Sequence, residues 1–317
     1  MSKRSIVCAG IDTGKHRLDV ALHGRPERLQ VPNTAEGHEQ LLVWLRQHRV
    51  KRVGIEATGG YEQTVVWRMR QGGFVVVVFQ PAQVRAYGRF HLRLAKNDKI
   101  DAALIAACTA DIRTIYAAPD RRLAELAELA TQIDQITRAM ARFKNHRESC
   151  RDAGLRQLWD DEIRRFRGLF RQRLKQLVAA IRRYPDLAER LDLILSIDGI
   201  ALRTASAIVV RMPEIGQLSR GQAGALAGLV PYDEDSGEHA GERHIAGGRE
   251  RLRNNLYVAA WIASLRWNPQ LTALYKRMRA AGKEHKVAVV ACARKLLIFA
   301  NAVVARGTPW QAHHTVH

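Results

Sequence analysis

The chain has 317 residues, of which 47% are hydrophobic, so it can bury real cores and is not a disordered tail protein. Its 51 Lys and Arg outnumber its 31 Asp and Glu, for a formal net charge of +20, which indicates a polyanionic partner because cations on a protein release the counterions of phosphates. No uninterrupted apolar run approaches the roughly 18 residues of a membrane span and no signal peptide is recognisable, so we expect nucleic acid as the partner and no membrane.

Strands and helices alternate through the first part of the chain. Apolar runs predict strands at 5–12, 18–24, 27–33, 52–57 and 74–80. Helical patterns follow at 35–48, behind an N-cap at Asn33-Thr34, and at 61–71. This order predicts an α/β domain with a mixed sheet that starts antiparallel and continues parallel. Ribonuclease-H-like domains are built this way, as are actin-like sugar kinases.

Four carboxylates stand in this part of the chain in an order that suits metal chemistry. Asp12 and Glu56 each end an apolar strand, and Asp98 and Asp101 lie three apart on one helical face. Magnesium prefers such hard oxygen ligands, and two-metal nucleic-acid chemistry needs several of them together. Any one of these residues alone can equally cap a turn or pair with an arginine. Lys15, in the turn after Asp12, either contacts a phosphate or is solvated.

A different pattern begins near residue 120 and predicts two long helices. The first has a coiled-coil seam through Leu126, Leu129, Ile133, Ile136, Met140 and Phe143. After a break at Asp152-Ala153-Gly154, a second stripe runs from Trp159 to Ile181 and ends near Tyr184-Pro185. The predicted helical hairpin serves either intramolecular packing or dimerisation. The arginines on its outer faces suit nucleic acid and a solvated surface about equally well.

The remaining sequence is helical and basic. Gly199 lies between two apolar helical stretches, with Thr204 beginning the second, which matches a helix-hairpin-helix whose amides cradle a phosphate; an ordinary short connection looks similar. Ser236 sits in a polar, glycine-rich stretch that is typical of a turn. The nearby arginines would stabilise charge on a phosphate attacked by that serine, and they are Arg243, Arg249, Arg251 and Arg253.

The cysteines and histidines indicate no metal site. Cys8, Cys108, Cys150 and Cys292 are not paired at metal-site spacing, so we expect reduced thiols and no disulfide framework. The histidines near the C-terminus lie in a tail, where metal binding is not expected.

Several stretches together resemble the insertion-sequence 110/1111 transposases, which are RNA-guided DNA recombinases that use a structured bridge RNA. They are AGIDTGKHRLDV, GIEATGGYE, NDKIDA, SIDGIALRTASAIV, AGLVPYDEDSG and LYVAA, in the family's order. The likeness covers nearly the whole chain, including the hairpin and the segment RKLLIFANAVVARGTPW.

The resemblance implies three domains: a RuvC-like domain at 1–118, a coiled-coil hairpin at 119–188, and a helical transposase domain with the helix-hairpin-helix at 189–317. Asp12, Glu56, Asp98 and Asp101 would be the acidic quartet that binds Mg²⁺ or Mn²⁺. Ser236 would be the nucleophile that forms a covalent phosphoserine link to DNA. The two sites would meet between protomers of a dimer or tetramer.

The implied partners are target and donor double-stranded DNA and a structured non-coding RNA that selects them. The implied location is the prokaryotic cytoplasm, with the nucleoid. The loop between Ser236 and Arg251 varies within the family, which leaves open which arginine contacts the scissile phosphate.

Three other functions compete with this expectation. A hydrolytic RuvC-like nuclease or Holliday junction resolvase would use the acidic site alone. An actin-like kinase is suggested by the opening Gly-Ile-Asp-Thr-Gly, although no convincing second phosphate loop follows. A non-catalytic nucleic-acid scaffold would need neither the carboxylates nor the serine.

Overall fold

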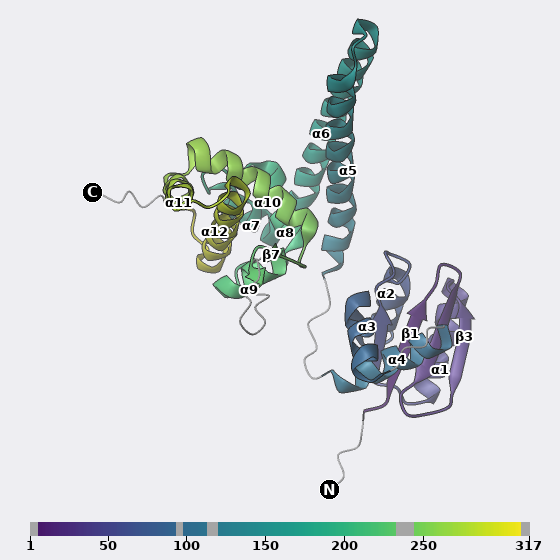
Figure 1. The fold of residues 1–317 in the computed structure, drawn as a ribbon. Helices are drawn as coiled ribbons and strands as arrows, with labels where there is room; N and C mark the ends of the chain where they lie inside the picture. The colour runs from purple at the N-terminus through teal and green to yellow at the C-terminus, as the bar shows by residue number, and fades with distance from the viewer. Residues whose placement is uncertain (1–5, 93–97, 113–119, 233–243, 312–317) are drawn as a thin grey trace. The chain divides into compact units, whose positions relative to one another are not determined.

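The computed structural model of this chain describes residues 6–92, 98–112, 120–232 and 244–311, with the backbone alone at 98–100. The chain divides into two compact units, Met1–Ala118 and Pro119–His317 (Figure 1). A five-stranded sheet lies in the first unit, and the second unit is mostly helical. The predicted architecture, an α/β domain followed by an all-α remainder, is confirmed. The division of the second unit into a hairpin domain and a transposase domain stays a prediction.

The sheet of the first unit is mixed. Its strands are β1 (Cys8–Thr13), β2 (Arg17–Leu22), β3 (Arg28–Pro32), β4 (Arg52–Glu56) and β5 (Val75–Phe79). They lie in the order β3-β2-β1-β4-β5. The pairs β1–β2 and β2–β3 are antiparallel, and β1–β4 and β4–β5 are parallel. The sheet therefore starts antiparallel and continues parallel, as predicted.

Helices cover both faces of this sheet (Figure 1). One face is packed by α1 (Ala35–Gln47) and α2 (Gln63–Gln71), whose buried Leu41 and Met69 share a core with Ile11 of β1. The other face is covered by α3 (Pro81–Phe90) and α4 (Asp98–Asp111), which share a smaller core with β5. The predicted N-cap of α1 is confirmed, because the Thr34 hydroxyl accepts a hydrogen bond from the Gly37 amide at 3.3 Å.

Helix α3 is an element that the sequence patterns did not predict. The apolar run of β5 was expected to stop at Pro81, but this proline also starts a helix. Proline suits the first helical position because its missing N–H needs no partner there. A reciprocal capping box between Gln80 and Gln83 completes the start of α3.

The second unit begins with a helical hairpin. Its helices are α5 (Arg121–Ser149) and α6 (Ala153–Arg182). The expected break at Asp152-Ala153-Gly154 is displaced, because Ala153 and Gly154 already belong to α6. Asp152 is the N-cap of that helix and its carboxylate accepts a hydrogen bond from the Leu155 amide at 2.8 Å, which fixes the start of the helix.

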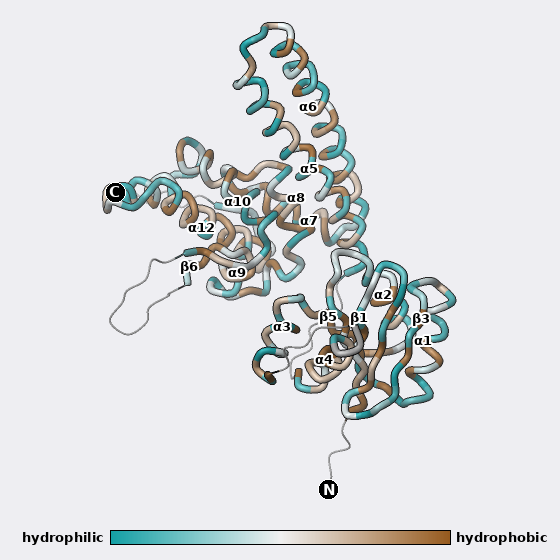
Figure 2. The backbone as a smooth tube through the Cα atoms, turned by 45° about the vertical axis from the view of Figure 1, so that its right-hand side comes forward, coloured by the Kyte–Doolittle hydropathy of each residue, from teal (hydrophilic) through white to brown (hydrophobic). Residues whose placement is uncertain are grey.

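The structure confirms the predicted apolar seam of the hairpin. Hydrophobic and hydrophilic residues alternate along both helices (Figure 2). Leu126 and Ile133 of α5 are buried, as are Leu177 and Ile181 of α6, all in one core. Farther along the hairpin, Phe143 of α5 and Trp159 of α6 stack with ring centroids 5.5 Å apart. The hairpin is therefore held along its length by side chains that were predicted to face inward.

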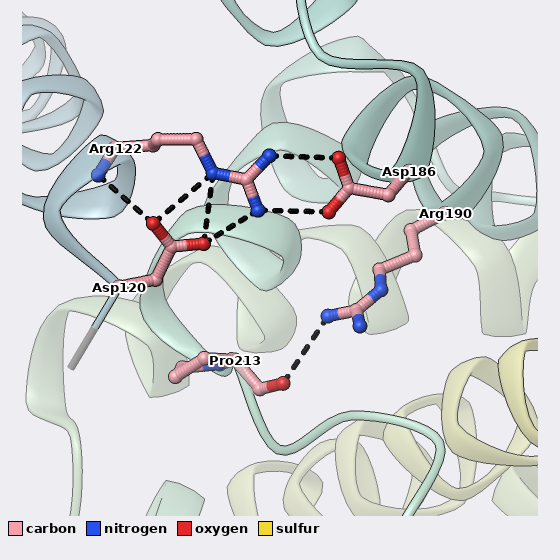
Figure 3. A network of polar contacts seen from close by, with 5 residues as sticks. All are labelled: Asp120, Arg122, Asp186, Arg190 and Pro213. Atoms are coloured by element: carbon pink, nitrogen blue, oxygen red, sulfur yellow. Dashed lines mark hydrogen bonds and ion pairs between the residues drawn. The ribbon is translucent and has the colours of Figure 1, made fainter. Parts of the chain in front are cut away.

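A charged cluster fastens the start of α5 to α7 (Pro185–Leu195) (Figure 3). The Arg122 guanidinium donates two hydrogen bonds to Asp186, at 2.8 and 2.9 Å, and also contacts Asp120. The Arg122 guanidinium beside each carboxylate holds the pKa of Asp120 and the pKa of Asp186 below their usual range. Beside this cluster, Arg190 donates to the Pro213 carbonyl at 3.2 Å.

The rest of the second unit consists of short helices around one long helix. After α7 come α8 (Leu202–Arg211), α9 (Arg220–Ala227), the short strands β6 (Pro231–Tyr232) and β7 (His244–Ile245), α10 (Glu250–Ile262), a π-helical turn η1 (Ala263–Trp267), α11 (Pro269–Ala280) and α12 (His285–Arg306). By length and composition α12 could cross a membrane, which the sequence patterns did not predict. Its Leu296 and Ala300 are fully buried in the core of the unit, as expected of the central helix of a packed domain.

All four cysteines are free thiols, in agreement with the sequence-based expectation. Cys8 and Cys292 are buried among apolar residues. Burial raises the pKa of the Cys8 thiol despite nearby Arg52, and raises the pKa of the Cys292 thiol to about 11. Both thiols therefore stay protonated and act as small hydrophobic groups.

Candidate active site

The register of the central strands brings two of the predicted carboxylates to one face of the sheet. Gly10 pairs with Gly54, and Ile11 with Ile55, across the parallel strands β1 and β4. The next positions in this register are Asp12 and Glu56. Because paired residues in neighbouring strands point to the same face, these two carboxylates leave the sheet on the same side. Both side chains are partly exposed.

A third carboxylate, Asp19 of β2, joins this face and was not predicted. Asp19 lies directly opposite Asp12 in the antiparallel pair β1–β2. It receives a hydrogen bond from Gln30 at 2.7 Å and an ion pair from Arg17 at 3.4 Å. Like charges directly opposite each other destabilise a sheet. The signal in the sequence was one acidic residue within the apolar run LDVAL, at a position that a buried strand would otherwise fill with a hydrophobic side chain.

Helix α4 lies on the same face, and two glycines allow its close approach. A Cβ on Gly10 would lie 2.2 Å from the Ala106 nitrogen, and a Cβ on Gly54 would collide with the Thr109 side chain. Glycine is therefore required at both strand positions because the backbone of a helix occupies the space of a side chain. In each strand, the glycine precedes the carboxylate by two residues and so shares its face.

The direction of α4 brings its acidic N-terminal turn to these carboxylates. At the far end, Arg52 at the start of β4 donates hydrogen bonds to the carbonyls of Thr109 and Ile112, at 3.2 and 3.1 Å. Toward the N-terminus, Ala102 lines a small hollow together with Asp19. Asp101 directly precedes Ala102, and the backbone of Asp98 lies one turn earlier. The Asp98 side chain lies outside the described residues.

The loop after Glu56 is organised by a second glutamate. The Glu62 carboxylate accepts hydrogen bonds from the Gly60 amide at 2.9 Å and from the Thr58 amide and hydroxyl, both at 3.1 Å. Partial burial raises the pKa of Glu62, but the hydrogen bonds outweigh it and the net pKa lies below its ordinary value. The stretch ATGGYE thus forms a closed turn that fixes the exit of β4 beside Glu56.

These residues fit a divalent cation by donor chemistry. Every acidic group involved offers hard carboxylate oxygens, which Mg²⁺ and Mn²⁺ prefer. Among the side chains that the structure describes, no three acidic, histidine or cysteine residues already enclose an ion position. A full protein cage is not required, since Mg²⁺ is often held by one or two carboxylates together with water and substrate phosphates.

The other residues predicted to contact nucleic acid differ in how far they are exposed. Lys15 is exposed in the turn between β1 and β2. Gly199 has φ +93° and lies against Ala263 of η1, where a Cβ would come within 2.3 Å, so its role includes close packing. The predicted start of the following helix at Thr204 is wrong: α8 begins at Leu202, and Thr204 is only 6% exposed. A buried threonine has little surface to offer a phosphate.

The arginines near the predicted serine are engaged within the protein. Arg249 forms a paired contact with Glu214, at 2.9 and 2.6 Å. Arg251 donates to the Thr131 hydroxyl at 2.6 Å, and Arg253 donates to the Gly247 carbonyl at 2.6 Å. These contacts give each arginine a structural role. Ser236 and Arg243 lie outside the described residues, and only the flanking strands β6 and β7, which pair antiparallel, are described.

A polar cluster that the sequence patterns missed ties α5 to α8. Asp134 of α5 pairs with Arg211 at 2.9 Å and lies 3.8 Å from Arg203. Burial lowers the pKa of both guanidinium groups, while the Asp134 carboxylate opposes that shift. Arginine stays charged at any physiological pH, so Asp134, Arg203 and Arg211 form a charged cluster that connects α5 to α8.

Comparison with protein families gives two matches to transposases. A family model described as a transposase, of the DEDD type of IS110 elements, matches residues 9–153. A second model, described as transposase of the IS116/IS110/IS902 family, matches residues 191–276. The first match contains all four predicted carboxylates, and the second contains Ser236.

Individual proteins are also similar to this chain, some of them over nearly its whole length. The chain is 27% identical to the pilin gene-inverting proteins of Moraxella bovis and Moraxella lacunata, over 98% of its length and 98% of theirs. It is 28% identical to an uncharacterized IS110 protein of Streptomyces coelicolor over 37% of its length and 29% of that protein. Among solved structures, T. thermophilus RuvC in complex with a Holliday junction substrate is 19% identical, with a TM-score of 0.27 over 32% of this chain and 91% of that one.

Proposed function

This chain belongs to the IS110 family of transposases and is a DNA transposase, and from that premise we propose a mechanism for its strand exchange. The carboxylate face of the first unit holds a divalent cation, Ser236 is the nucleophile, and a structured guide RNA selects the target and donor DNA. The protein acts on DNA in the cytoplasm, at the nucleoid.

The observation that carries the proposal is the gathering of carboxylates beneath α4. Asp12 and Asp19 are directly opposite each other, and the register brings Glu56 alongside. Asp101 arrives on the N-terminal turn of the helix that packs on this face. Adjacent like charges lower the stability of a sheet. A cation bound between the carboxylates would offset that loss.

The metal ligands in this proposal are Asp12, Glu56, Asp98 and Asp101, and Asp19 adds negative charge beside Asp12. A divalent cation bound there would draw a DNA phosphate to the site and stabilise the negative charge that develops on it. Arg17 and Gln30 hold Asp19 in place, and the Glu62 turn fixes the end of β4. The protein groups thus set the position of the phosphate before reaction.

Ser236 attacks that phosphate in the proposed mechanism. Its oxygen forms a bond to phosphorus, the bond to one deoxyribose oxygen breaks, and the serine proton passes to that leaving oxygen. The new phosphoserine ester keeps the energy of the broken phosphodiester, so a second strand can be joined by the reverse reaction. Support comes from the family match around Ser236 and from the resemblance of the Ser-Gly element.

Guide RNA and oligomerisation rest on the family resemblance and on charge. The net charge of +20 suits a protein that holds long nucleic acids. In the proposed assembly, the acidic site of one protomer and Ser236 of another form a composite site in a dimer or tetramer. Such an arrangement would bring together two groups that lie in different units of one chain.

Strand exchange in vitro tests the mechanism. The full-length protein, with the RNA that co-purifies with it, is assayed on DNA carrying the element ends. We expect Ser236→Ala to lower joined product by at least about a thousandfold, and Asp12→Asn by at least about a hundredfold. RNase treatment should abolish exchange by the wild type. The exposed hairpin substitutions Ser149→Ala and Asp161→Asn are matched controls and should retain activity.

The rival outcomes are distinct. Full exchange by Ser236→Ala would contradict the serine mechanism. If that variant cut DNA and released free ends, the protein would be a hydrolytic RuvC-like nuclease. Exchange that survived RNase treatment would remove the guide RNA from the account.

A further inference from the structure

A groove of about 720 Å³ opens in the second unit, between α10, α11 and α12 and beside the strand pair β6–β7. Its volume is within the range of about 300 to 1,000 Å³ that is usual for ligand pockets. The walls are mainly apolar, with Leu274 and Met278 from α11 and Val290 from α12. At its mouth, Val287 of α12 is 49% exposed. An exposed apolar hollow of this size is typical of a surface that binds an apolar group.

The charged side chains that the structure describes in this groove are cationic. Arg253, Lys286, Arg294 and Lys295 line it, and none of the described lining residues is Asp or Glu. The Arg294 Nε is buried and makes no hydrogen bond within the described residues. Its side chain passes close to Gly224 of α9, where a Cβ would lie 3.1 Å from Nε. The Arg294 guanidinium has no acidic partner among the described residues that line the groove, and an anionic ligand would supply one.

We propose that this groove binds one unstacked nucleotide of the DNA strand that the enzyme processes. The base lies against the apolar wall and beside Tyr257, and its phosphate is held by Arg294 and Lys286. Proteins hold extruded nucleotides by this combination of an apolar or aromatic slot for the base and cations for the backbone. The inference deepens the proposed function, on which it rests, by assigning a DNA contact outside the acidic site.

DNA fits the groove better than a second copy of this chain. A second copy of this chain carries the same net charge of +20 and would be repelled by a cationic groove. The position also favours DNA, because His244 and Ile245 of β7 and Pro231 of β6 line the groove. These strands flank the segment that contains Ser236. An unstacked nucleotide held here would pull its strand toward that segment.

Duplex binding measures this contact directly. The probe is a fluorescein-labelled DNA duplex with a single-nucleotide bulge, compared by anisotropy with the same duplex without the bulge. We expect the full-length wild-type protein to bind the bulged duplex about tenfold more tightly, as the stacking of one base allows. Arg294→Gln, which removes the cation, and Val287→Glu, which adds an anion at the exposed mouth, should each reduce that preference to about twofold or less.

The controls match each substitution away from the groove. Arg277→Gln removes one cation from an exposed position of α11, and Val43→Glu adds an acid at a position of α1 that is 52% exposed. Both should keep the tenfold preference. Equal wild-type binding of the two duplexes would overturn the proposal, as would an equal loss in the controls. A preference for a bulged RNA duplex of the same sequence over the DNA would assign the groove to the guide RNA and overturn the DNA assignment.

Failure of this inference and failure of the proposed function are distinguishable. If Ser236→Ala abolished exchange while Arg294→Gln kept the bulge preference, the groove proposal alone would fail. If the groove variants lost the preference while Ser236→Ala still exchanged strands, the serine mechanism alone would fail.

Discussion

Glu62 shows how one side chain can organise the surroundings of a candidate ligand without being one. Its carboxylate accepts three hydrogen bonds from Thr58 and Gly60, so the turn after Glu56 closes on itself. Without that acceptor, the Thr58 and Gly60 amides would have to donate their hydrogen bonds to water instead. The position of Glu56 therefore depends on a residue six places farther along the chain.

The substitution Glu62→Gln should loosen this turn at neutral pH. The folded pKa of Glu62 is depressed, so its stabilisation is complete above the unfolded-state pKa of about 4.3 and is lost as the pH falls through the folded value. We expect the variant to lose about 1 kcal/mol of local stability at about pH 7. The difference from wild type should shrink as the pH falls below about 4.3 and vanish only below the folded pKa of Glu62.

Hydrogen-exchange mass spectrometry of the peptide spanning residues 57–63 measures this difference in the full chain. Glu125→Gln, at an exposed position of α5, is the control and should leave that peptide unchanged. A difference between Glu62→Gln and wild type that persisted at low pH would contradict the assigned role of the carboxylate.

The strand-end carboxylates could be located from the sequence, whereas the partners of individual contact residues could not. The ends of the apolar runs gave Asp12 and Glu56, because a charged residue that terminates a buried strand stands out. The partners of Arg249 and Arg251 did not stand out, since Glu214 and Thr131 are distant in sequence. Asp19 was missed because its neighbours form a continuous apolar strand, and only the register reveals what it faces.

At the scale of elements, the close packing of α4 on the sheet determines whether the acidic groups lie near one another. The helix packs directly on strand backbone at Gly10, with no side chain between them. A methyl group there would meet the backbone of Ala102 and Ala106, which cannot rotate away as a side chain could. The helix as a whole would have to move, and Asp98 and Asp101 would move with it.

Gly10→Ala should therefore impair both stability and activity. We expect a loss of about 2 to 3 kcal/mol in the free energy of unfolding from overpacking, and strand exchange at least about tenfold slower because the proposed metal ligands separate. Urea unfolding and the exchange assay are the measurements.

The matched control is Gly168→Ala. Gly168 lies on α6 with open space where a Cβ would stand, so alanine should raise helix stability by about 0.5 to 1 kcal/mol and leave exchange unchanged. Equal effects of the two substitutions would contradict the close packing of α4 on the strand at Gly10.

Element types were largely predictable, and element boundaries were less so. Alternating apolar runs gave the strands, and the heptad spacing gave both helices of the hairpin, because buried positions recur with the period of the element. The start of α3 at Pro81 was missed because proline both ends a strand and begins a helix. The start of α6 was displaced because Asp152 is a cap, which a break in the apolar pattern does not distinguish from a turn.

At the scale of the whole molecule, several motifs were enough to predict the family, whereas the core of the second unit required the structure. The hairpin and the later helices share one hydrophobic core, in which Leu126 and Leu177 lie together with Leu187 and Leu297. Contacts between segments so far apart in sequence leave no periodic signal. The hairpin base is thus part of the same packed body as the helices that flank the Ser236 segment.

The central claim concerns the whole enzyme: its strand exchange depends on a divalent cation held by the carboxylate face of the first unit. Electron paramagnetic resonance of Mn²⁺ titrated into the full-length protein tests that claim most directly. We expect wild type and the hairpin control Asp161→Asn to bind Mn²⁺ equally, and Asp12→Asn to bind it at least about tenfold more weakly. Mn²⁺ binding by Asp12→Asn at the wild-type affinity would contradict the account.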